Sequence, residues 1–125
     1  SIGALEIEEL VGVYMQIELG YGIYTPTNKK DTKEYEYILF KRQNPKERAK
    51  LQVKTSGINL NEYNVGDIPF YFFTLGNYYK DGKVLKEDEK EKYQKLNKVK
   101  FLTKEELLEF SKRNEKVLPY KINWF

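Results

Sequence analysis

Residues 49–55 read Ala-Lys-Leu-Gln-Val-Lys-Thr, and this stretch decides the fold that we predict. The alternation of apolar Leu51 and Val53 with polar neighbours is typical of a β-strand. Side chains two residues apart in a strand share a face, so Gln52 and Lys54 are expected to point the same way. Val53 is expected to point into the opposite layer.

The segment before this strand predicts its partner. Residues 35–41, Tyr-Glu-Tyr-Ile-Leu-Phe-Lys, are strand-forming, and residues 42–48 contain Asn44-Pro45 and several charges, which are typical of a turn. We therefore predict an antiparallel hairpin of residues 35–41 and 49–55. Its pairing brings the strand that contains Glu36 alongside Gln52 and Lys54, so a carboxylate, an amide oxygen and a lysine are expected to converge.

The rest of the chain supplies the layers around this hairpin. Helix formers and apolar spacing predict helices over residues 4–19 and about 104–113, the second opened by a capping box at Thr103. Strands are expected at 21–25 and 69–75, the latter buried on both faces. One helical turn is expected at 60–63, a turn at 80–83, and a solvated loop or surface helix at 86–95. The pattern indicates an α+β or α/β domain with helices flanking the sheet.

Composition limits the class of protein and the chemistry. A chain of 125 residues with 40% hydrophobic side chains is expected to form one domain, residues 1–125. The chain has 33% charged residues and no apolar run near the roughly 20 residues of a membrane helix, so membrane spanning is excluded. The chain has no His and no Cys, which excludes Ser-His-Asp and Cys-His catalysis, zinc fingers and disulfides. The absence of Cys fits a reducing compartment, so we expect a cytoplasmic protein.

The net charge of +3 is unevenly distributed. Residues 1–20 carry four Glu and no base, whereas residues 21–54 carry nine Lys and Arg against four acids, a local charge of +5. This excess is suited to phosphate contacts, although a lysine-rich composition is also expected from an A/T-rich genome. The candidate phosphate contacts in this segment are Lys29, Lys30, Lys33, Lys41 and Arg42.

The predicted convergence suits metal-assisted hydrolysis of a phosphodiester. Mg²⁺ prefers hard oxygens, which a carboxylate, an amide and a backbone carbonyl such as that of Val53 supply. A lysine beside them orients the attacking water and offsets developing charge. The first helix offers a further carboxylate, because Glu9 and Glu6 share an arc with Val13 and Ile17 that we expect to be buried.

At these residues the sequence resembles the PD-(D/E)xK nuclease superfamily, the fold of many restriction enzymes and Holliday junction resolvases. The resemblance covers nearly the whole chain: a helix with a Glu, Gly20-Tyr21 leading into a first strand, Tyr35–Leu39 as the acidic strand and Ala49–Thr55 as the next. It implies a restriction endonuclease-like core of α-β-β-β-α-β order, with a central mixed sheet and flanking helices.

The resemblance also implies residue roles. Glu36 and Gln52, with the Val53 carbonyl, would hold Mg²⁺ or Mn²⁺, Lys54 would be the catalytic lysine, and Glu9 would be the helix acid. The substrate would be DNA, cut by an endo- or exonuclease. Two departures are Glu36 in place of the commoner Asp, and Gln52 at the (D/E)xK acid, as in the QxK variant of several branches.

Other interpretations stay open at this point. A Gln-Val-Lys on an amphipathic strand is commonly a plain solvent face, and Gln52 is also compatible with an inactive nuclease-fold module that binds nucleic acid or a protein partner. Because the chain opens at Ser1, an accessory domain of a larger protein is a third interpretation. A homodimer is also open, since several members of the superfamily work as dimers.

Overall fold

The computed structural model describes residues 4–24, 37–116 and 118 and shows a mixed α+β fold around a central mixed sheet. The elements are, in chain order, α1 (Ala4–Ile17), β1 (Tyr21–Tyr24), β2 (Tyr37–Lys41), β3 (Asn44–Lys54), β4 (Ile58–Asn59), the 3₁₀ turn η2 (Leu60–Glu62), β5 (Phe70–Thr74), β6 (Tyr78–Lys80), β7 (Lys83–Val84), α2 (Glu87–Asn97), β8 (Val99–Phe101) and α3 (Lys104–Arg113).

The central sheet has the strand order β1-β2-β3-β5-β8. Strands β1, β2 and β3 pair antiparallel, whereas β5 runs parallel to β3 and β8 runs parallel to β5. Strand β3 therefore lies in the middle of the sheet. Strands β4, β6 and β7 form a second sheet, in which the turn predicted at residues 80–83 joins β6 to β7. Asp81 and Gly82 in this turn have φ of 52° and 77°.

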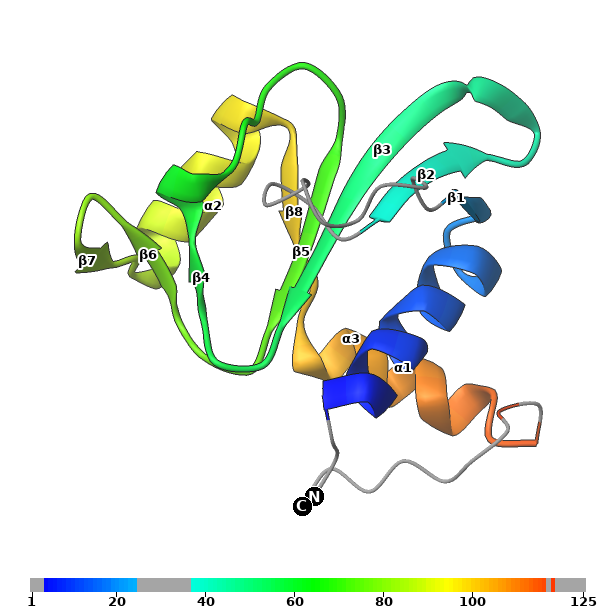
Figure 1. Ribbon diagram of the computed structural model, residues 1–125. Helices are drawn as coiled ribbons and strands as arrows, with labels where there is room; N and C mark the ends of the chain where they lie inside the picture. Colours follow the sequence, from blue (N-terminus) through cyan, green and yellow to red (C-terminus); the bar gives the residue numbers. More distant parts are fainter. Residues whose placement is uncertain (1–3, 25–36, 117, 119–125) are drawn as a thin grey trace.

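Two apolar layers cover the central sheet (Figure 1). Helices α1 and α3 pack on one face, against Leu39, Leu51 and Phe73. The second sheet packs on the other face, where its Ile58 and Tyr78 join Phe70 and Phe72 of β5. Strand β5 thus buries side chains on both faces, as predicted.

The hairpin of β2 and β3 is longer than the sequence predicts. Residues 44–48 were expected in the turn, but they belong to β3, and the turn is confined to residues 42–43. Proline in a central strand would cost a ladder hydrogen bond. Pro45 is tolerated because β5 begins opposite Lys50, so the first part of β3 pairs with β2 alone.

Helix α1 also differs from its prediction. Its buried residues are Ile7, Leu10, Val11, Tyr14 and Met15, whereas Ile17 is 52% exposed. Of the predicted buried arc, only Val13 packs against the core, and it is half-buried. The expectation is wrong for Ile17 and for Glu6 and Glu9, which are exposed. Apolar residues occur on several sides of this helix, so the sheet and α3 decide which side is buried.

Helix α3 begins as predicted, with Thr103 at its N-cap and Glu106 closing a capping box. None of the helices in the described ranges combines the length and the apolar character that crossing a membrane requires.

Candidate active site on strand β3

The predicted Gln-Val-Lys motif lies at the end of the central strand. Gln52, Val53 and Lys54 pair with Phe72, Phe73 and Thr74 of β5. On the other side of β3, Leu51 pairs with Tyr37, the first described residue of β2. The motif therefore lies beside the point where β2 begins.

Gln52 is the one polar or charged residue that is buried in the described part of the chain, with 3% of its surface exposed. Its side chain shares a face of β3 with Lys50 and Lys54, while Val53 packs into the opposite layer with α1. No described residue forms a hydrogen bond with the Gln52 amide. No side-chain atom of Gln52 is both fully buried and without a hydrogen-bond partner, so the amide can be reached by a ligand at the end of β3.

The two lysines that flank Gln52 differ in their surroundings. Lys54 is exposed at the end of β3, where a large substrate can reach its ammonium group. The Lys50 side chain is only 13% exposed, and its Nζ lies 4.0 Å from Asp67 Oδ1 and 5.6 Å from the centre of the Phe70 ring. Lys54 is therefore the lysine that is available for chemistry at this site.

Helix α1 presents a different carboxylate to the sheet than predicted. Glu9 is exposed, whereas Glu8 is half-buried and accepts a hydrogen bond of 3.2 Å from the Tyr37 hydroxyl. Glu8 thus ties α1 to the start of β2. Glu8 lies beside the buried residues Ile7 and Val11 of α1. The sequence alone does not identify Glu8, because the packing of α1 determines which side of the helix is buried.

Two of the predicted phosphate contacts close the end of α1. Lys41 Nζ donates to the Leu19 carbonyl at 2.6 Å and lies 4.3 Å from the centre of the Tyr21 ring, and Arg42 Nη2 donates to the Gln16 carbonyl at 2.9 Å. The last carbonyls of a helix lack partners and carry partial negative charge. Lys41 and Arg42 satisfy that end, a role that the sequence did not reveal.

Glu36, Lys29, Lys30 and Lys33 lie outside the described residues. The described ranges contain no group of three or more Asp and Glu side chains that could hold a metal. The amide oxygen of Gln52 suits Mg²⁺ as a hard ligand, and so does a backbone carbonyl such as that of Val53. These donors fit part of a magnesium site, and the carboxylate would have to come from Glu36.

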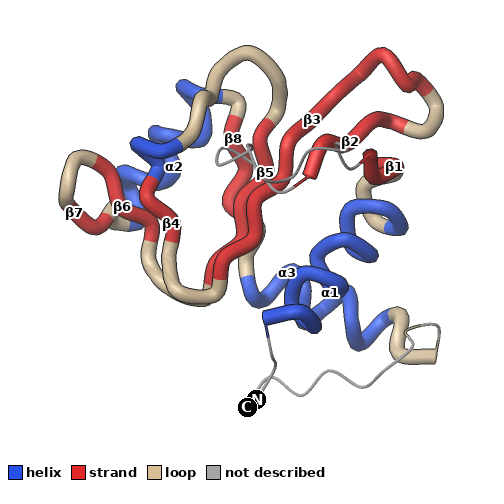
Figure 2. The backbone as a smooth tube through the Cα atoms, in the orientation of Figure 1, coloured by secondary structure: helices blue, strands red, loops and turns tan. Residues whose placement is uncertain are grey.

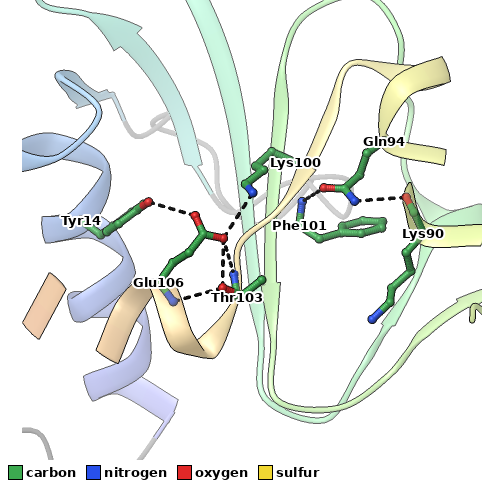
Figure 3. A network of polar contacts seen from close by, with 7 residues as sticks. All are labelled: Tyr14, Lys90, Gln94, Lys100, Phe101, Thr103 and Glu106. Atoms are coloured by element: carbon green, nitrogen blue, oxygen red, sulfur yellow. Dashed lines mark hydrogen bonds and ion pairs between the residues drawn. The ribbon is translucent and has the colours of Figure 1, made fainter. Parts of the chain in front are cut away.

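A second polar cluster joins α1 to α3 (Figure 3). Glu106 Oε2 accepts from the Tyr14 hydroxyl at 3.4 Å, and Oε1 accepts from Thr103 and lies 3.2 Å from Lys100 Nζ. Burial, reinforced by the negative charge of Glu106, raises the pKa of Tyr14 to about 12. The protein itself satisfies both Glu106 oxygens, so this cluster serves to hold the helices together.

No family model matches the chain, and neither a curated protein nor a solved structure was found to be similar to it.

Proposed function

We propose that this chain is a metal-dependent nuclease that hydrolyses phosphodiester bonds of DNA on a restriction endonuclease-like core. The observation that carries the proposal is the position of Gln52, 3% exposed on the central strand and two residues from the exposed Lys54. The resemblance in the sequence implies a metal ligand and a catalytic lysine at these two positions.

The order and direction of strands β1, β2, β3 and β5 support the same core. Helix α1 is followed by the antiparallel strands β1, β2 and β3, and β5 then returns parallel to β3. The expected α-β-β-β-α-β order is not met, because the crossover from β3 to β5 contains only β4 and the short turn η2 where that order requires an α-helix. The strand that carries Gln52 and Lys54 is the middle strand of the sheet, and Lys54 at its end is exposed.

Glu36 completes the proposed site. The pairs of β2 and β3 run from Phe40 with Arg48 to Tyr37 with Leu51. Glu36 directly precedes Tyr37 in the sequence, and the resemblance gives it the role of the acidic metal ligand that acts with Gln52. Glu8 would act as a positioning residue there, because its bond to Tyr37 fixes the residue that follows Glu36.

The proposed chemistry is attack of water on phosphorus, with cleavage of the bond to the leaving oxygen, which then takes a proton. Glu36, Gln52 and the Val53 carbonyl would hold the metal. When bound, Mg²⁺ or Mn²⁺ supplies Lewis-acid polarisation of the phosphate. Lys54 would hold the attacking water by a hydrogen bond and offset the charge that develops on the phosphate oxygens.

The alternative is an inactive module of the same fold that binds nucleic acid or a protein. The neutral amide at a ligand position favours it, since an amide lacks the charge of a carboxylate. Cleavage assays with Mg²⁺, with Mn²⁺ and with EDTA separate the two functions. Metal-dependent products that disappear in Lys54→Ala support the nuclease, whereas a shift in gel mobility without products supports the module.

The helix carboxylates give a matched pair of variants. Glu8→Gln is expected to lower cleavage because it weakens the bond that fixes Tyr37, and Glu9→Gln, on the exposed side of the same helix, is expected to leave it unchanged. The reverse result would restore Glu9 as the helix acid.

A further inference from the structure

The hairpin of β2 and β3 extends past its neighbours as an arm (Figure 2). We define the arm as residues 42–48, all of which are exposed. Only β2 pairs with this part of β3, because β5 begins opposite Lys50. An unsupported, fully exposed hairpin contributes little to the core, so its sequence is free to serve a contact.

The charge of the arm is strongly positive. Arg42, Lys46 and Arg48 face a single acid, Glu47. The Arg42 side chain donates a hydrogen bond to the Gln16 carbonyl at the end of α1. Lys46 and Arg48 are therefore the two cations of the arm that are not held by another described element. Arg48 Nε donates to the Pro45 carbonyl at 3.2 Å, and its guanidinium makes no other hydrogen bond to a described residue. An arginine has five donors, so most of them are available for an anion.

The arm is continuous with the candidate site. Arg48, Lys50, Gln52 and Lys54 occupy every second position of β3 and therefore share one face of the sheet. The rise of about 3.3 Å per residue places Arg48 about 13 Å from Gln52 along the strand. At 3.4 Å per base pair, this corresponds to about four base pairs of a duplex.

We propose that this arm binds the phosphodiester backbone of duplex DNA to one side of the bond that is cut, through Lys46 and Arg48. This inference rests on the proposed function, and it assigns a phosphate contact to residues that the sequence did not single out. Binding of this kind carries no sequence preference and weakens with salt, because each phosphate contact releases counterions.

The test measures binding of a labelled 20-base-pair duplex by fluorescence anisotropy over a series of salt concentrations, in EDTA so that nothing is cut. The variant is Lys46→Gln with Arg48→Gln. The matched control is Lys92→Gln with Lys95→Gln, which removes the same charge from exposed positions of α2. Circular dichroism verifies that both proteins are folded.

Loss of two phosphate contacts is expected to lower the slope of log K against log salt by up to about 1.8, with no change in the control. Equal slopes in the arm variant and the native protein would overturn the proposal. So would an equal loss in the control, or failure of the native protein to bind the duplex. If polyglutamate binds in place of DNA and the arm variant loses that binding, the partner is an acidic protein and the proposal is wrong.

The DNA-binding arm and the nuclease function can fail independently of each other. Binding that depends on the arm, without cleavage in Mg²⁺, overturns the nuclease and leaves the arm intact. Cleavage that survives with an unchanged salt slope in the arm variant overturns the arm and leaves the nuclease intact.

Discussion

Replacing Gln52 by leucine is expected to abolish the activity of the protein with little change in its stability. The two side chains are similar in bulk, and position 52 is 3% exposed on the face that holds the cluster of Phe70 and Phe72. No side-chain atom of Gln52 is both fully buried and without a partner, so the leucine relieves no desolvation penalty and the free energy of unfolding should change by less than about 1.5 kcal/mol. At about 4 °C per kcal/mol for a chain of this size, the melting temperature should change by less than about 6 °C.

The assay is thermal unfolding in EDTA, followed by titration of the cleavage rate against Mg²⁺ for the same proteins. The leucine variant should not cleave at any Mg²⁺ concentration, because the ligand oxygen is gone. Gln52→Glu is the control: it should keep cleavage and need less Mg²⁺, since a carboxylate adds charge at the metal. In EDTA it should melt below the native protein, because a buried charge is uncompensated.

Two results would refute this reasoning. A leucine variant that melts more than about 6 °C below the native protein shows that the Gln52 amide makes a hydrogen bond that stabilises the fold. A leucine variant that cleaves with the native Mg²⁺ requirement shows that Gln52 is not a ligand.

Three further predictions concern other parts of the molecule. Glu36→Ala should abolish cleavage while changing circular dichroism and melting little, as should Lys54→Ala, and full activity in either variant excludes that residue from the site. Gly22→Ala should lower the free energy of unfolding by about 1–3 kcal/mol in urea titrations, because a Cβ at this position would lie 2.4 Å from Phe40 Cζ. If Gly22→Ala lowers the free energy of unfolding equally in a Phe40→Ala background, contact with Phe40 is not the cause. Tyr14 ionises near pH 10 when unfolded and near 12 when folded, so its contribution to stability is complete below pH 10 and is lost from pH 10 to 12. Over that range Tyr14→Phe should lose less stability than the native protein, and equal losses would show that Tyr14 titrates normally.

Local signals in the sequence predicted several elements correctly. The capping box at Thr103 and Glu106 sets the start of α3, and the predicted range of about 104–113 matches its bounds. The Asp81-Gly82 pair adopts positive φ, as a tight hairpin turn requires, and the helical turn expected at 60–63 is the 3₁₀ turn η2. In each case the residues that fix the geometry are neighbours in sequence.

Elements that depend on distant partners were missed. Strand β8, with only Val99, Lys100 and Phe101, lies within a charged region whose local pattern gives no strand signal. Its place is set by pairing with β5 and by Gln94 of α2, whose Oε1 accepts from the Phe101 backbone N–H at 2.9 Å and covers the edge of the sheet.

The candidate site shows the same division. Period-two alternation predicted that Gln52 and Lys54 share a face and that Val53 joins the opposite layer, and the packing agrees. The exchange of Glu9 for Glu8 at the sheet, and the use of Lys41 and Arg42 at the end of α1, follow from how α1 docks. No periodicity within α1 could show this, because several of its sides carry apolar residues.

The nuclease proposal is tested most directly by incubating plasmid and single-stranded DNA with the native protein and with Lys54→Ala, each with Mg²⁺, with Mn²⁺ and with EDTA. We predict cleavage of at least one substrate by the native protein with either metal, none in EDTA and none by the variant. Cleavage that persists in EDTA or in Lys54→Ala, or a native protein that leaves both substrates intact with both metals, would contradict the assignment of a metal-dependent nuclease site to β3.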